Sequence, residues 1–198
     1  MTITNGYATL AEFKALYSVS GTDATRDAAI ELVVEDVSRI IDNLCGRQFY
    51  GAAPATTRVF TASSSVRCFI DDCTTVTKVE TDDGSITFSY DWATSDYYTI
   101  PANTTPITCV EVKPMGIYRF PYARNMVRIT AVWGYNLTSA GAPGPIRRAC
   151  LLQSNRIYER RKAAFGITSV SEIAPMTVIA LDNDVIQMIT PYIKNWGG

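Results

Sequence analysis

The sequence predicts an α+β protein: a helical bundle built from N- and C-terminal helices, with an inserted antiparallel β section. Apolar residues recur at helical spacing in the first 50 residues, alternate with polar residues from about residue 55 to 135, and return to helical spacing at Pro145. We therefore divide the chain into four segments. They are N-terminal helices over 1–50, a β section of the same domain over 51–140, a long basic helix over 141–166, and an extended arm with a C-terminal helix over 167–198.

The composition is that of a globular protein. Apolar residues make up 47% of the 198 residues and charged residues 19%, which is enough apolar material for a sizeable core. Lys and Arg total 18 against 19 for Asp and Glu, so the whole chain has no bulk attraction for nucleic acid or anionic membrane. Because no apolar stretch approaches the roughly 20 residues of a membrane span, we expect a soluble protein without a secretion signal.

The numbers and positions of cysteine and histidine limit the kinds of site that the protein can form. The five cysteines form no C-x-x-C pair, and an odd number cannot close completely into disulfides, so we expect reduced, mostly buried thiols. Cys68 and Cys73 lack a second ligand pair for zinc. The absence of histidine removes the commonest general base and metal ligand. We predict no metal, no cofactor and no catalytic residue.

Two helices are predicted near the N-terminus. Thr9 and Glu12 form the T-x-x-E pattern of a capping box at the start of the first. Asp23 can cap the second, and Gly46 is suited to the left-handed conformation that ends a helix. The apolar positions of the second helix recur at three- and four-residue spacing: Ile30, Val33, Val34, Val37, Ile40, Ile41 and Leu44.

The β section consists of short runs separated by turn residues. The runs are TTRVFTA, VRCFIDD, TVTKVETDDGSITFSY, DYYTI, ITCVEVKP and MVRITAVWGY, and they predict a small antiparallel sheet. Asp83-Gly84 is the strongest hairpin signal among them. The carboxylate pairs Asp71-Asp72 and Asp82-Asp83 each follow a predicted strand and lack the spacing of a calcium loop, so we interpret both as turn residues.

The helix predicted from Pro145 to Gly166 carries two apolar stripes. The first consists of Ile146, Ala149, Cys150, Gln153, Ile157 and Ala164. The second consists of Leu151, Tyr158 and Phe165 at heptad spacing, about a third of a turn away. One stripe can face the protein's own second helix, while the other either completes the same core or contacts a neighbouring subunit. Leu151, Tyr158 and Phe165 are the candidate subunit interface.

The same helix carries six basic residues: Arg147, Arg148, Arg156, Arg160, Arg161 and Lys162. The last three complement the dipole at the C-terminal end of the helix. Arg147 and Arg148 lie at the opposite end, where no such explanation applies, and are candidates for contact with an acidic partner. Because no nucleic-acid-recognition motif accompanies these charges, docking to protein is favoured over specific reading of nucleic acid.

Two other classes of function stay open. The segment GAPGP lacks the lysine of a phosphate-binding loop, and no G-x-S-x-G elbow is present. A hydrolase working with two carboxylates remains compatible with the composition, although nothing points to one. The main alternative is a carbohydrate- or protein-binding module, in which the clustered aromatic residues Tyr90, Trp92, Tyr97 and Tyr98 stack on a ligand rather than fill the core of the sheet.

Three segments resemble the head-to-tail connector proteins (head-completion adaptors) of tailed bacteriophages. The first is YATLAEFKALYSVSGTDATRDAAIELVVEDVSRIIDNLCGRQFY. The second is VRITAVWGY, followed after a break by PGPIRRA and a helix that ends in YERR, and the third is the closing VIQMITPYIK. Together they touch about half of the chain, at its two ends. The β section is longer than in the compact all-helical adaptors.

The resemblance implies a virion structural protein, made in the host cytoplasm and located at the head-tail junction. Copies would form a dodecameric ring on the portal protein, extend the DNA channel and offer a platform to the next neck or tail protein. Leu151, Tyr158 and Phe165 would then face a neighbouring subunit, and Arg147, Arg148, Tyr192 and Trp196 would contact the portal or a neighbour. Any contact with DNA would be nonspecific, and no membrane is involved. A neighbouring neck protein such as a stopper is the alternative within this class.

Overall fold

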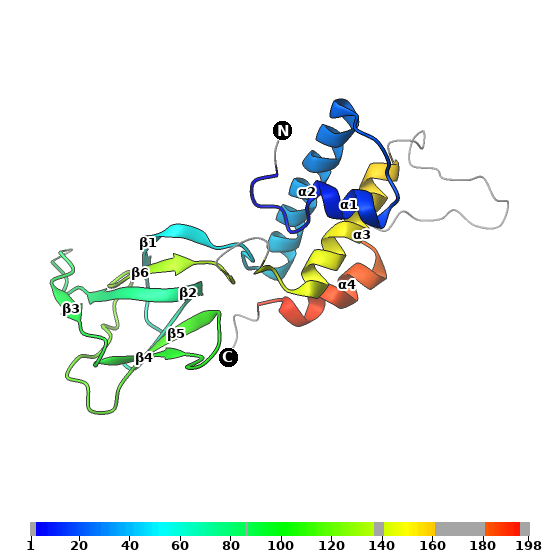
Figure 1. Ribbon diagram of the computed structural model, residues 1–198. Helices are drawn as coiled ribbons and strands as arrows, with labels where there is room; N and C mark the ends of the chain where they lie inside the picture. Colours follow the sequence, from blue (N-terminus) through cyan, green and yellow to red (C-terminus); the bar gives the residue numbers. More distant parts are fainter. Residues whose placement is uncertain (1–2, 86, 137–140, 161–180, 195–198) are drawn as a thin grey trace. The chain divides into compact units, whose positions relative to one another are not determined.

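The computed structural model describes residues 3–85, 87–136, 141–160 and 181–194. Within them lie four α-helices and a six-stranded antiparallel sheet, which confirms the predicted α+β class (Figure 1). The chain divides into two compact units: Met1–Gly46 with Ala142–Gly198, and Arg47–Gly141. The helical unit is therefore built from both ends of the chain, and the sheet unit is inserted between them.

The two predicted N-terminal helices begin and end where their caps require. Helix α1 spans Leu10–Leu16, and Thr9 and Glu12 form the reciprocal capping box expected from the sequence. Helix α2 spans Ala24–Cys45, and the carboxylate of Asp23 accepts hydrogen bonds from the amides of Thr25 and Arg26. Gly46 ends α2 in the left-handed conformation, at a φ of 62°.

Two helices from the C-terminal part of the chain complete the helical unit. Helix α3 spans Gly144–Arg160, with Pro145 in its first turn, so the predicted helix is confirmed to residue 160. Residues 161–166 and the arm expected over 167–180 lie outside the described residues. Helix α4 spans Asn183–Ile189 and continues into the 3-10 helix η3 (Thr190–Tyr192), which contains Pro191.

The sheet unit contains strands of very different length. They are β1 (Ala52–Phe60), β2 (Arg67–Thr81), β3 (Tyr90–Trp92), β4 (Tyr97–Ile100), β5 (Ile107–Val112) and β6 (Val127–Trp133). The order across the sheet is β1-β6-β2-β5-β4, and β3 also pairs with β2. The first part of β2 pairs with β5 and the later part with β6, so this strand joins the two halves of the sheet.

The prediction for Asp71 and Asp72 was wrong. Both lie inside the continuous strand β2, not at the end of a strand. The charges are accommodated by ion pairs, because Asp71 lies 2.6 Å from a guanidinium nitrogen of Arg58 and Asp72 lies 3.5 Å from one of Arg47. The pairing with β5 also shifts register between Phe69 and Cys73, which lets the strand deviate where the carboxylates lie.

The second carboxylate pair does form a turn. The side chain of Asp82 accepts a hydrogen bond from the amide of Gly84, and Asp83 accepts one from Ser85. Strand β3 pairs with β2 beyond this turn, so the hairpin is confirmed. It is wider than the Asp83-Gly84 signal suggested, because β3 begins only at Tyr90.

The core of the sheet unit lies against one face of the curved sheet. The central strand β6 alternates buried and partly exposed residues along its whole length. Its buried residues pack with aromatic side chains from the connecting segments. The core consists of Cys68, Ile70, Cys73, Val79, Trp92, Tyr97, Ile107, Val110, Val112, Phe120, Val127, Ile129, Ala131 and Trp133.

Candidate functional site

The first apolar stripe of α3 packs against α2 inside the helical unit. Cys150 is fully buried, and its sulfur lies 3.5 Å from the hydroxyl of Ser38 on α2. That hydroxyl donates to the carbonyl of Val34 and accepts the amide hydrogen of Tyr7. Burial raises the pKa of the Cys150 thiol, which therefore stays protonated and unreactive.

The second stripe also finds a partner within the chain. Tyr158 is 5% exposed, and its ring packs edge-on against Phe13 of α1 with a centroid distance of 5.8 Å. The carbonyl of Leu151, which is half-buried, accepts a hydrogen bond from the hydroxyl of Tyr17 at 3.3 Å. Phe165 lies outside the described residues. These contacts within one chain give Tyr158 a structural role in the core. They do not test whether the stripe also contacts a neighbouring subunit, and that contact stays a prediction.

The two arginines at the start of α3 have different surroundings. Arg147 forms an ion pair with Glu12 of the α1 capping box. Burial opposes the ionisation of Glu12, but hydrogen bonds from Thr9 and the charge of Arg147 outweigh it and lower the pKa of this carboxyl. Arg148 is exposed beside Tyr17 and makes no ion pair with any described residue. Arg148 is therefore the better placed of the two to contact another molecule.

The remaining predicted contact residues belong to the end of the chain. Tyr192 lies on η3 and, with Pro145, Met188 and Pro191, lines a shallow hollow of about 370 Å³. Asp184 and Gln187 lie at the same hollow. Trp196 lies outside the described residues. Arg156 of α3 pairs with Asp182 at 2.8 Å, so this basic residue holds the start of α4 rather than an outside partner.

The structure exposes Ile40 and Leu44, which belong to the predicted apolar pattern of α2, together with Leu32, which lies outside that pattern. Leu32, Ile40 and Leu44 on α2 are 48%, 38% and 42% exposed, and we call this row the α2 stripe. Ile40 and Leu44 lie about 80° and 120° round the helix axis from Leu32, while the buried row is centred at about 190°. The signal was available, because apolar positions spread over an arc this wide exceed what one neighbouring face can cover.

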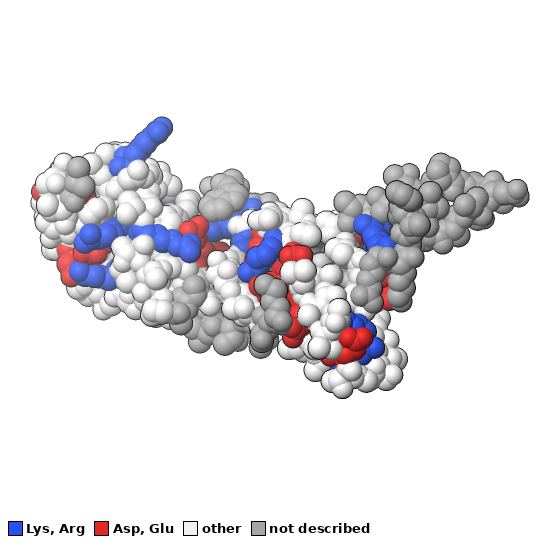
Figure 2. All heavy atoms as spheres, turned by 90° about the horizontal axis from the view of Figure 1, so that it is seen from above, with Lys and Arg blue, Asp and Glu red and all other residues white. Residues whose placement is uncertain are grey.

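Charged side chains are mixed rather than segregated. On the face seen in Figure 2, basic side chains form a band over the sheet unit, and acidic side chains border it. Part of the reason is a network in which Glu80 accepts hydrogen bonds from Arg128 and Lys78, while Lys78 also pairs with Asp91. A surface with this balance gives little nonspecific attraction to a polyanion.

Of the four clustered aromatic residues, Trp92 and Tyr97 belong to the core of the sheet unit, whereas Tyr90 and Tyr98 are about half exposed. Trp92 is 4% exposed, its indole nitrogen donates to Thr81 at 3.0 Å, and its ring stacks on Phe120 and Tyr118 at 4.7 and 5.3 Å. Tyr97 is buried as well. Stacking on a sugar would require Trp92 to leave these contacts, so the carbohydrate-binding alternative loses its central residue.

The described residues offer little for metal or covalent chemistry. They contain no group of three or more acidic, cysteine or histidine side chains that could hold a metal ion. All five cysteines are buried and none of them is in a disulfide, and burial raises the pKa of Cys68 to about 12. No helix among the described residues is long and apolar enough to cross a membrane. Within the described part of the chain, the features best placed to contact another molecule are the exposed apolar surfaces and Arg148.

No protein-family model and no curated protein matches the sequence. Solved structures match the fold over nearly the whole chain. A chain in the neck of an empty gene transfer agent (GTA) particle, computed with C6 symmetry, gives a TM-score of 0.62 at 16% identity, covering 100% of this chain and 96% of that one. Chains in the neck of a native GTA particle, computed with C12 symmetry, and in the virion of a native GTA particle give TM-scores of 0.55 and 0.57 at 15% and 17% identity. Both cover 96% of this chain and 91% of theirs, and at these identities the likeness establishes the fold.

Proposed function

We propose that this chain is a non-enzymatic structural subunit of the neck of a phage-like particle, located at the head-tail junction of the virion and made in the host cytoplasm. The observation that carries the proposal is the extent of the fold match. A neck chain of the GTA particle covers both the helical and the sheet unit, 100% of this chain and 96% of its own length. A shared fold alone leaves function open, but the predicted adaptor-like segments at both ends of the sequence agree with it.

Within the neck, we infer that the chain is the adaptor. Copies would form a ring, with twelve members as in the C12 neck, that docks on the portal, extends the DNA channel and presents a platform to the next neck or tail protein. Subunits related by a cyclic axis of this order contact one another through two different surfaces, one on each side of the subunit. The chain must therefore present a pair of complementary lateral faces.

The α2 stripe is the surface best suited to one of these faces. It presents three large apolar side chains with one exposed charge, Asp36, between them. Fully burying a leucine or isoleucine is worth about 1.5–3 kcal/mol, so covering the stripe in a ring contributes substantially to assembly. Leu151 is half-buried and remains a candidate for the opposite face, together with Phe165. Tyr158 instead stabilises α1 against α3 within the subunit.

The portal contact is assigned to exposed groups of the helical unit. Arg148 has no acidic partner among the described residues and can reach one on the portal. The hollow beside Tyr192 gives the C-terminal end an apolar recess, and Trp196 follows it in the sequence. Arg147 contributes less, because Glu12 already neutralises it. Any contact with DNA in the channel is nonspecific, and the mixed surface charge keeps it weak.

The test is to measure the mass of the purified chain by mass photometry, alone and mixed with the portal protein of the same genome. A ring-sized species, or a stoichiometric complex with the portal, is expected. A chain that binds a tail protein but ignores the portal would instead be a stopper-like neck component. A persistent monomer that ignores both proteins would contradict the neck assignment.

A further inference from the structure

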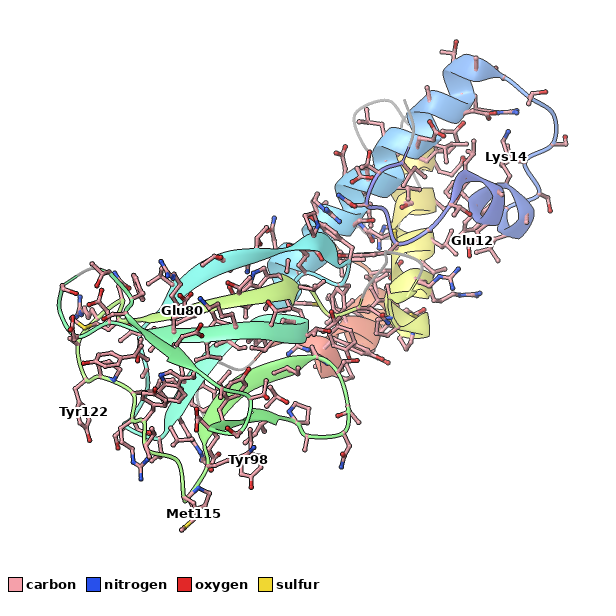
Figure 3. All side chains as sticks on the ribbon, turned by 60° about the vertical axis from the view of Figure 1, so that its left-hand side comes forward. Glu12, Lys14, Glu80, Tyr98, Met115 and Tyr122 are labelled. Carbon is pink, nitrogen blue, oxygen red and sulfur yellow. The ribbon has the colours of Figure 1, made fainter. Side chains whose placement is uncertain are left out.

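The connection between β5 and β6, residues 113–126, combines a middle part that is held by the core with exposed apolar side chains on both sides of it. Three large apolar side chains protrude from it: Met115 is 94% exposed, Ile117 82% and Tyr122 85%. Figure 3 shows Met115 and Tyr122 pointing away from the ribbon of the sheet unit. Large apolar side chains this exposed on one short segment mark a contact surface more often than an ordinary loop.

The middle of this loop is held in place by the core. Phe120 is 2% exposed and stacks on Trp92, and the ring of Tyr118 stacks on the same indole. The amide of Phe120 donates to the carbonyl of Ser65 at 2.9 Å, and that of Asn125 donates to the hydroxyl of Thr61 at 3.0 Å. The protruding side chains are thus presented by a segment whose backbone is already ordered, which reduces the entropy lost on binding.

The charges of the loop indicate which kind of molecule it can bind. Residues 113–126 include three cations, Lys113, Arg119 and Arg124, and no acidic residue. Lys113 donates to the carbonyl of Thr94 and lies over the ring of Tyr98, and Arg119 donates to carbonyls of the loop itself. Arg124 is exposed and makes no ion pair with any described residue. With two cations used to brace the loop, its most exposed side chains are apolar, which favours a protein partner over the phosphate backbone of DNA.

We propose that this loop inserts its exposed side chains Met115, Ile117 and Tyr122 into an apolar surface with an acidic rim on a different protein of the neck, the one that stacks on the ring. This inference rests on the proposed neck function. A second copy of the chain is the less suitable occupant, because both lateral faces are already assigned to the helical unit, one to the α2 stripe and the opposite one to Leu151 with Phe165. The loop belongs to the separate sheet unit and needs a partner of its own.

The experiment uses thiol labelling and a matched pair of multiple variants. The native cysteines are all buried, so a thiol introduced by Met115→Cys is labelled selectively, as is a control thiol from Asp83→Cys in the exposed turn of the same unit. In assembled particles we expect labelling at position 115 to slow at least tenfold relative to the free chain, and labelling at position 83 to be unchanged. Equal labelling at position 115 in both states would overturn the proposal.

The second measurement separates this inference from the neck assignment. The variant Met115→Ser/Ile117→Ser/Tyr122→Ser should still form the ring and bind the portal, but should bind the downstream neck protein at least roughly 100-fold more weakly, because central apolar anchors each contribute about tenfold or more. Val59→Ser/Phe69→Ser, which truncates two exposed apolar residues elsewhere on the sheet unit, is the control and should bind normally.

Failure of the neck function and failure of the loop inference would give different experimental results. A wild-type chain that neither forms a ring nor binds the portal contradicts the neck function itself. A normal ring whose triple variant binds the downstream protein at full strength overturns only the loop inference. Loss in the triple variant of self-association, of binding to a 30-base-pair DNA duplex, or of binding to phosphatidylglycerol vesicles would also overturn it, in favour of a second copy, nucleic acid or membrane.

Discussion

Ser38 of α2 and Cys150 of α3 meet at the centre of the helical unit, with the hydroxyl oxygen 3.5 Å from the sulfur. The same hydroxyl receives the amide hydrogen of Tyr7, so one buried side chain ties the N-terminal segment and two helices that are far apart in the sequence. The residues involved come from the two ends of the chain. This contact therefore reports directly on whether the helical unit has assembled.

We expect Ser38→Ala to lower the free energy of unfolding by about 1–3 kcal/mol, because the buried amide of Tyr7 loses its acceptor. The measurement is urea denaturation followed by circular dichroism. Ser20→Ala, at an exposed position, is the control and should stay within about 0.5 kcal/mol of the wild type. An unchanged stability in Ser38→Ala would show that this contact does not hold the unit together.

In the sheet unit, we expect Phe120→Ala to cost about 3–5 kcal/mol, because it removes a buried ring that stacks on Trp92 at 4.7 Å. The near-ultraviolet circular dichroism of the tryptophan should change with it. Phe69→Ala truncates the same side chain at a position that is 49% exposed and should cost much less. Equal losses in the two variants would rule out the stacked cluster as the core of this unit.

The ion-pair network around Glu80 predicts a pH dependence. Hydrogen bonds from Arg128, and then from Lys78, lower the pKa of Glu80 against the opposing effect of burial. A lowered folded-state pKa stabilises the fold above the ordinary glutamate pKa of about 4.3, and this stabilisation is lost as the pH falls through the lowered value. We expect Glu80→Gln to reduce the loss of stability between neutral and acidic pH, measured by denaturation at each pH.

The control for this pH prediction is Asp71→Asn, which breaks the ion pair with Arg58. Both side chains of that pair are about two-fifths exposed, at 40% and 39%. Exposed pairs contribute at most about 1 kcal/mol, so the pH profile of this variant should follow the wild type closely. If Glu80→Gln showed the full wild-type pH dependence, the network would not be its source.

Charge reversal at Arg147 should affect the stability of the chain, whereas charge reversal at Arg148 should affect its binding to the portal. Arg147→Glu places a second carboxylate beside Glu12 and should lower the free energy of unfolding by up to about 1 kcal/mol. Arg148→Glu should leave stability within about 0.5 kcal/mol of the wild type but weaken portal binding in a pull-down titration. Full portal binding by Arg148→Glu would remove this residue from the proposed contact.

The local signals in the sequence predicted the ends of the elements well, because caps depend on neighbours within one turn. The Thr9-Glu12 capping box, the Asp23 cap and the left-handed Gly46 are all present. The same local reasoning failed at Asp71 and Asp72. A pair of acidic residues favours a turn on its own, and only the distant Arg47 and Arg58 make it acceptable inside a strand.

The residues that form exposed contact surfaces were harder to predict than the positions of the helices and strands. Periodicity identifies apolar positions but not which of them find a partner within the chain, so Ile40 and Leu44 share one predicted pattern with the buried residues of α2 although the structure exposes them. In the same way, heptad spacing could not show that Tyr158 would meet Phe13. The exposed residues of the loop at 113–126 followed no helical or strand period and gave no sequence signal.

The α2 stripe gives the decisive test of assembly. We expect Ile40→Glu/Leu44→Glu to prevent ring formation, because each new carboxylate would have to leave water to enter an apolar subunit contact. Both side chains are about two-fifths exposed in the single chain, so the fold should persist, with stability reduced by no more than about 1–2 kcal/mol. Sedimentation velocity of the chain with its portal protein measures the ring, and circular dichroism verifies the fold.

The matched control is Leu16→Glu, at an apolar position on α1 that is 38% exposed, and this variant should assemble. Rings of normal size from the double variant would mean that subunits contact one another elsewhere, and the half-buried Leu151 would become the next position to change.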